Sequence, residues 1–238
     1  MPSTTRKRSK AADTRTAILD AAETHFARHG FDRARLEDVA TACGIKRAAI
    51  FYHFKDKQEL YEKTLKRLTT DLFIRIQEAL SLSHAGAADL PARMLEALDV
   101  WMDFIGERPT FARLILRVAA DAESDADSRE AGLGSLFAGP FFEFIEDVLE
   151  RGEKQGLLKP LSRDPLHIAS TLAGATVFFV AAMPAFAGSR QFNPMDAKQY
   201  EAHRRDAIAV AKKVLGLPDN LVHPPLRPRE TESPTSPS

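Results

Sequence analysis

The chain has 238 residues, of which 44% are hydrophobic and 28% are charged, a composition typical of a globular protein with a sizeable core. Its single cysteine excludes an internal disulfide and fits a reducing compartment, so we expect a cytoplasmic protein. The formal net charge is zero, but residues 1–57 hold 12 Lys and Arg against 7 Asp and Glu, whereas residues 58–238 hold 21 against 26. The basic first quarter favours an anionic partner for that segment.

The chain begins with a polar, basic segment and then turns helical. Residues 1–11 are rich in Lys and Arg and predict a flexible arm. Apolar residues at helical spacing follow, at Ile18, Ala22 and Phe26, and predict a helix that ends at Gly30.

Two short predicted helices, near residues 36–42 and 46–53, are joined by a tight turn at Gly44. Two helices joined in this way form a helix-turn-helix, whose first helix crosses the DNA backbone while the second enters the major groove. We therefore place a helix-turn-helix at residues 36–55.

A capping-box pattern, Asp56 with Glu59 three residues later, begins the next, long helix. Beyond it, apolar stripes separated by Gly, Pro or polar residues predict further helices. The helices from Asp56 onward lie near residues 56–80, 89–107, 109–121, 133–155, 164–185 and 196–215. No segment alternates like a β-strand, so we predict an all-α protein, with a disordered tail over the Pro- and Ser-rich residues 218–238.

Residues 167–189 carry no formal charge and are long enough to span a bilayer. Ser, Thr, Gly and Pro interrupt this run, and its centre is rich in alanine. We therefore expect a helix buried between protein surfaces and no membrane partner.

Many spaced residues in the first sixty positions follow one known pattern. They are Ile18-Leu19-Asp20-Ala21-Ala22, Phe26, Gly30-Phe31, Asp38-Val39-Ala40, Gly44-Ile45, and Ile50-Phe51-Tyr52-His53-Phe54 with Lys57 and Leu60. Over residues 13–62 the sequence resembles the DNA-binding domain of the TetR family of transcriptional regulators. The resemblance implies an N-terminal three-helix DNA-binding domain over residues 12–58. It also implies a helical ligand-binding and dimerisation domain over residues 59–217.

By this resemblance, the DNA-facing residues come from the helix-turn-helix and the start of the helix after it. They are Arg35, Lys46, Arg47, Ala48, Ala49, Tyr52, His53 and Lys57. Arg47 can bond bidentately to a guanine, and Tyr52 and His53 can donate to phosphates. Lys57 sits where its charge opposes the helix dipole, a cost that a phosphate would offset.

The sequence also departs from the family pattern. The family usually has Thr or Ser at the positions of Ala34 and Arg35, Ser or Thr at Lys46, and Tyr at Phe51. Basic residues replace the hydroxyls at positions 35 and 46, so phosphate contacts can persist in another form, whereas Phe51 cannot donate. We therefore expect DNA binding that is more salt-dependent than is usual for the family.

The helical body suggests a ligand pocket and a dimer interface. Aromatic and apolar residues predict an apolar pocket or an ordinary core: Met94, Trp101, Phe104, Phe111, Ile115, Phe137 and Phe141. Small and aromatic residues predict a four-helix dimer interface: Ala173, Phe178, Phe179, Met183, Ile208 and Ala211. Arg113 and Arg117, one turn apart, can meet an anionic ligand head, a carboxylate partner or solvent.

The residues and the resemblance together predict a regulator that binds a palindromic operator as a homodimer, with double-stranded DNA and a small apolar effector as partners. The resemblance alone implies that it is a repressor, released by its ligand. A helical interaction protein that has lost DNA binding and an all-α enzyme remain the alternatives. We expect no enzymatic activity, because no catalytic set is visible, and no cofactor. We expect no metal, because His25 and His29 have no evident third ligand. Cys43 fits a small buried residue before the turn better than a redox sensor.

Overall fold

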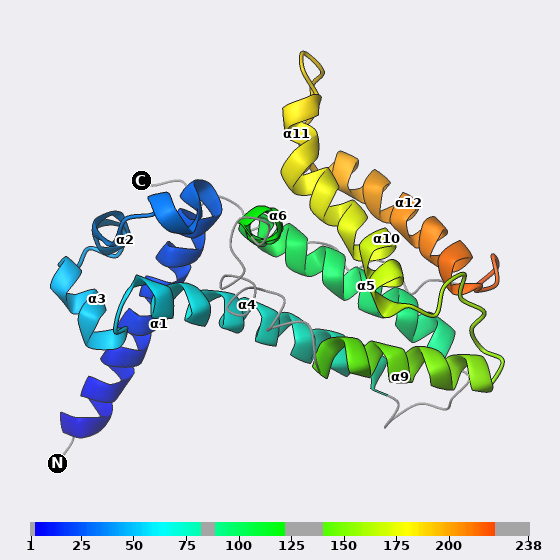
Figure 1. Cartoon of the computed structure of the whole chain (residues 1–238), viewed down its shortest axis with the longest axis horizontal. Helices are drawn as coiled ribbons and strands as arrows, with labels where there is room; N and C mark the ends of the chain where they lie inside the picture. Colours follow the sequence, from blue (N-terminus) through cyan, green and yellow to red (C-terminus); the bar gives the residue numbers. More distant parts are fainter. Residues whose placement is uncertain (1–2, 82–88, 122–139, 222–238) are drawn as a thin grey trace, which may run out of the picture.

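The computed structural model describes residues 3–81, 89–121 and 140–221 (Figure 1). Every regular element in these ranges is helical, which confirms the all-α prediction. The helices are α1 (Ser3–Arg33), α2 (Leu36–Ala42), α3 (Arg47–His53), α4 (Lys57–Leu80), α5 (Leu90–Glu107), α6 (Pro109–Asp121), α9 (Pro140–Lys154), α10 (Pro165–Val177), α11 (Met183–Phe186) and α12 (Ala197–Leu215). A π-helical turn, Phe178–Ala182, joins α10 to α11.

Helices α1, α2 and α3 form a head at one end of the molecule. Ile18, Phe26 and Ile50 are fully buried in its core, as the helical spacing predicts. Gly30 interrupts α1 with a φ of 75° and a ψ of 175°, an extended conformation at positive φ that essentially only glycine adopts. Over residues 3–11, where we expected a flexible arm, the backbone continues α1 towards the N-terminus.

Helix α4 leads from the head into the body, and its start is fixed by the predicted cap. The Asp56 carboxylate accepts a hydrogen bond from the backbone N–H of Glu59 at 2.8 Å. The Glu59 carboxylate reaches back to the N–H of Lys55 at 2.7 Å, one residue before the partner that a capping box requires. This turn orients α3 relative to α4.

The body packs α5 along α4, with α6 lying against α1 and α10–α11 and α12 forming an outer layer (Figure 1). Helix α9 corresponds to the helix predicted near residues 133–155, beginning at residue 140. Residues 133–139 lie outside the described ranges. Of the predicted tail, residues 218–221 continue from α12, where the Lys212 ammonium donates to the carbonyls of Asp219 and Leu221. Residues 222–238 lie outside the described ranges.

The uncharged run forms the α10–α11 rod. Pro165–Phe186 has a mean hydropathy of 1.7 and is 22% buried within the chain, so by length and composition alone it passes the test for a membrane span. One such helix is weak evidence for a membrane.

Candidate functional site

The helix-turn-helix is held by a tight turn and a small apolar core. Gly44 adopts a φ of 65°, and the N–H of Ile45 bonds the carbonyl of Ala40 at 3.0 Å. The side chains of Ile50 and Phe54 are 0% and 1% exposed and pack α3 onto the core of the head. The opposite face of α3 therefore projects into solvent.

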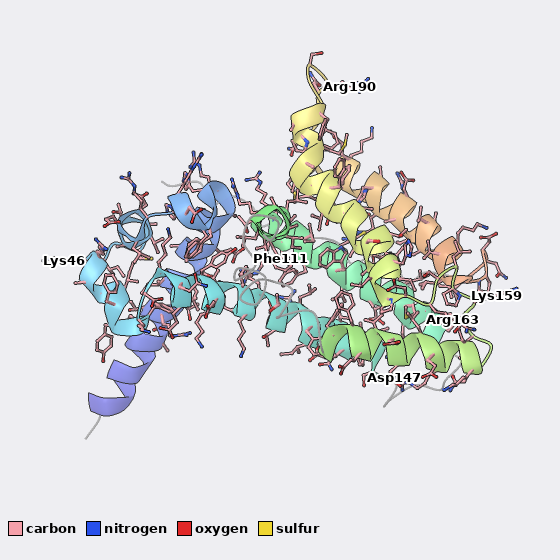
Figure 2. All side chains as sticks on the ribbon, in the orientation of Figure 1. Lys46, Phe111, Asp147, Lys159, Arg163 and Arg190 are labelled. Carbon is pink, nitrogen blue, oxygen red and sulfur yellow. The ribbon has the colours of Figure 1, made fainter. Side chains whose placement is uncertain are left out.

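The structure brings the sequence-predicted DNA-facing residues together around α3. Arg35, Lys46, Arg47, Ala48 and Tyr52 are exposed, while Ala49, His53 and Lys57 are half-buried. Tyr52 projects furthest, with 83% of its surface exposed. Lys46 lies at the outer edge of the head, at the opposite end of the molecule from Lys159 (Figure 2).

A shallow groove of about 410 Å³ runs between α2, α3 and the start of α4. Its wall holds three basic side chains and three acidic ones: Arg35, Arg47 and Lys57, with Asp32, Glu37 and Asp56. Arg35 and Lys46 occupy the N-cap positions of α2 and α3 and make no side-chain capping bond. The basic replacements therefore leave two helix N-termini without a side-chain cap, where an anion can bind the backbone N–H groups.

The guanidinium of Arg47 is engaged on the protein surface. Its Nη1 lies 2.6 Å from the Glu37 carboxylate, and both side chains are about half exposed. The same guanidinium lies 5.5 Å from the centre of the Phe51 ring. Because solvent screens this ion pair, it contributes little to stability and opens at low cost.

Lys57 also has partners within the head. Its Nζ donates to the Asp32 carbonyl at 3.0 Å and lies 4.7 Å from the centre of the Phe31 ring. The dipole cost that we expected a phosphate to offset is already reduced by these contacts. Lys57 as a phosphate contact stays a prediction.

A second candidate site is a cavity of about 600 Å³ in the body. Helices α4, α5, α6, α9 and α10 supply most of its wall, which is almost entirely apolar. Four residues of the predicted pocket line it: Met94, Trp101, Ile115 and Phe141. Its volume lies in the usual range for small-molecule sites.

Two other predicted pocket residues, Phe104 and Phe111, do not line this cavity. Phe104 and Phe111 are fully buried and pack edge to face, with their ring centres 5.3 Å apart, so they belong to the ordinary core. Phe111 lies near the middle of the molecule in Figure 2. Phe137 lies outside the described residues.

The predicted dimer residues divide in a similar way. Ile208 and Ala211 are buried at 9% and 0% exposure within the same chain, so they are not on a surface open to a second copy. Their stripe on α12 packs against α5 and α10 instead. Ala173 and Phe178 line the cavity, and Phe178 is also 48% exposed. Phe179 and Met183 are half-buried, and Phe179 stacks on His203 with ring centres 4.1 Å apart.

Sequence reasoning missed the contacts that join the head to the body. Arg117 of α6 donates to the carbonyls of Ala27 and Arg28 at 2.8 and 2.6 Å. The buried Glu23 of α1 accepts hydrogen bonds from Arg108 at 2.9 Å and Thr110 at 2.5 Å. These partners lie 85 to 90 residues apart in sequence, so no local pattern could have found them.

The weaker motifs carry no site in the part of the chain described. His25 and His29 stack with ring centres 6.1 Å apart, and no group of three or more possible ligands lies close enough to hold a metal ion there. Burial, with a smaller contribution from Asp20, raises the pKa of the Cys43 thiol, which lowers its thiolate fraction.

The family and sequence comparisons match the head of the chain most strongly. The model of the family described as bacterial regulatory proteins, tetR family, matches residues 18–64. The chain is 39% identical over 62 residues to the HTH-type transcriptional repressor BepR of Brucella suis, a match that covers 26% of this chain and 30% of that protein. It is 28% identical over 152 residues to the probable acrEF/envCD operon repressor of Escherichia coli K12, covering 63% of this chain and 67% of that protein.

The fold over most of the chain is similar to that of solved regulators. The transcriptional regulator FadR from Bacillus subtilis, solved in complex with stearoyl-CoA, superposes with a TM-score of 0.62 at 15% identity. The superposition covers 85% of this chain and 99% of that one. At this identity the likeness establishes the shared fold alone.

Proposed function

We propose that the chain is a DNA-binding transcriptional regulator of the TetR family, because the model of that family matches residues 18–64 of its head. The observation that carries the proposal is the exposed basic face of α3 within the matched residues 18–64. The relatives described above are named as repressors, and we infer the same direction of control here. We further propose that the chain acts in the cytoplasm and has no enzymatic activity of its own.

The proposed contact surface is α3 and its borders. Arg47 is the candidate for bidentate reading of a guanine, while Arg35, Lys46 and Lys57 neutralise phosphates. Tyr52 and His53 donate to phosphates, and Ala48 and Ala49 offer apolar contact to a thymine methyl. This division assigns sequence discrimination to Arg47, Ala48 and Ala49, and most of the affinity to the residues that contact phosphates.

The test is binding of the full chain to the DNA upstream of its own coding sequence, measured by fluorescence anisotropy. Arg47→Ala should weaken binding by about tenfold, because a bidentate base contact contributes about 1–3 kcal/mol. Lys159→Ala is the matched control, since this exposed lysine lies at the far end of the molecule (Figure 2) and should leave binding unchanged. Equal binding by the wild type and Arg47→Ala would count against the proposed surface.

We also propose that two copies assemble through α10–α11 and α12. Exposed apolar side chains gather there: Leu166, Phe178, Phe186 and Val210 are between 47% and 69% exposed. Monomeric proteins rarely leave such surface open. A two-fold dimer would set two copies of α3 into successive major grooves, so the operator should be palindromic.

The proposed effector site is the cavity in the body, and α6 is the proposed link to the head. One side of α6 lines the cavity with Ile115, Leu116 and Val118. Another side holds the end of α1 through Arg117. A ligand that moves α6 would therefore move α1 and lower operator affinity, a coupling of about 1–3 kcal/mol.

A further inference from the structure

Phe51 is an aromatic residue on the exposed side of α3. Its surface is 45% exposed, whereas its neighbours Ile50 and Phe54 are 0% and 1% exposed and supply the core of the head. The ring lies in the wall of the shallow groove between α2, α3 and the start of α4, together with Arg47. The packing of the head therefore gives no reason for an aromatic side chain at this position.

The Phe51 ring is placed to hold the guanidinium of Arg47. Arg47 Cζ lies 5.5 Å from the ring centre, within the range at which a cation is attracted to an aromatic face. The two residues are four positions apart in α3, so they share one side of the helix. The guanidinium thus has an acidic partner on α2, Glu37 at 2.6 Å, and an aromatic partner on its own helix.

These two partners differ in whether they are compatible with a bound guanine. The Glu37 carboxylate lies at a guanidinium nitrogen, so it competes for the N–H groups that a guanine requires, and the phosphates repel it. Phe51 is uncharged and attracts the cation through the face of its ring, so it uses none of these N–H donors. The guanidinium can therefore exchange Glu37 for a guanine and keep Phe51. Bound DNA also excludes water from the pair, which strengthens the attraction between cation and ring.

We propose that Phe51 is a positioning residue for sequence discrimination: its ring holds the Arg47 guanidinium on the DNA-facing side of α3 while the guanidinium bonds a guanine. The inference rests on the proposed function, in which Arg47 reads the base. It adds a residue that makes no polar contact with DNA and acts through Arg47. Removal of the ring costs the contact to the guanine and leaves the contacts to phosphates in place.

A double-mutant cycle on the full chain tests the proposal, with binding to the upstream DNA measured by fluorescence anisotropy. Phe51→Leu keeps an apolar side chain of higher helix propensity and removes the ring. It should weaken binding to the upstream DNA by about threefold to tenfold, and leave binding to random-sequence DNA of the same length unchanged. In the Arg47→Ala background the same substitution should change binding by less than about twofold, because the ring has no guanidinium to hold.

Two further variants complete the cycle. Phe51→Tyr keeps the ring, so its coupling to Arg47 should equal that of the wild type. Phe51→Met is a second helix-favouring variant without a ring, and it should behave as Phe51→Leu does. Thermal unfolding of each variant checks that the head remains folded.

The outcomes separate this inference from the proposed function. A loss of equal size in both backgrounds would show that Phe51 acts on the fold or on DNA by itself, and would overturn the inference. Unchanged binding by both ring-free variants would also overturn it. In either case the wild type still binds its upstream DNA and Arg47→Ala still weakens that binding. Absence of tight binding by the wild type would instead mean that the proposed function fails.

Discussion

At the scale of single residues, the most consequential contact on the DNA-facing surface is between Glu37 and Arg47. The Glu37 carboxylate forms an ion pair with the Arg47 guanidinium, the group that we propose binds a guanine. Its Oε1 lies 2.6 Å from Arg47 Nη1. Base reading by Arg47 therefore requires this pair to open. A carboxylate in this place also repels the phosphate backbone.

Glu37→Gln should consequently tighten operator binding severalfold at low salt, with the gain shrinking as salt screens the repulsion. Anisotropy titrations at several salt concentrations measure the effect. Glu146→Gln removes an exposed carboxylate from α9, far from the head, and serves as the control. Weaker binding by Glu37→Gln would mean that Glu37 positions Arg47 for DNA, contrary to this account.

At the scale of elements, α6 is fastened to the end of α1 by Arg117, whose guanidinium bonds two of the last carbonyls before Gly30. Arg117→Ala should lower the free energy of unfolding by about 1–3 kcal/mol, because hydrogen bonds from charged donors are lost. Hydrogen exchange should accelerate at the end of α1 and stay unchanged in α9. Arg113→Ala, one turn earlier and exposed, should change neither quantity. Unchanged exchange in α1 with Arg117→Ala would remove α6 as the proposed link.

Two glycines with the same backbone conformation provide a matched comparison of turn packing. Gly216 ends α12 with a φ of 64°, and a Cβ there would lie 2.2 Å from the carbonyl oxygen of Lys159. Gly44 has a φ of 65°, with nothing within 4 Å of the added atom. Gly44→Ala should cost about 1–2 kcal/mol from the left-handed conformation alone, and Gly216→Ala should cost clearly more. Urea denaturation measures the free energy of unfolding of both variants. Equal losses would contradict the close packing of Gly216 against Lys159.

The helices and the head were predictable because their signals are local. Periodic apolar residues, Gly30, Gly44 and the Asp56 cap each act within a few residues of chain. The lining of the cavity and the burial of the outer helices were predicted less well. An apolar stripe indicates burial without indicating what covers it, so Ile208 was assigned to a partner copy although its own chain buries it. Phe104 and Trp101 share one stripe of α5, and only the packing of the other helices decides which one faces a cavity.

At the scale of the whole molecule, the proposed dimer predicts that one side of the body is sensitive to charge. Val210→Arg should convert the dimer to a monomer in sedimentation equilibrium, because it buries a charge in an apolar interface. Ile74→Arg is the matched control: both residues are 47% exposed, but Ile74 lies on α4, outside the proposed interface. A dimer that persists in Val210→Arg and dissociates in Ile74→Arg would place the interface elsewhere.

The central claim is that the basic face of the head grips DNA largely through phosphate contacts. The most direct test is the affinity of the wild-type chain for its own upstream DNA across a range of salt concentrations. A dimer with two such heads should lose about three orders of magnitude or more in affinity between about 50 mM and 200 mM salt, as counterion release requires for at least six neutralised phosphates. No tight binding at low salt, or binding that does not change with salt, would contradict the account.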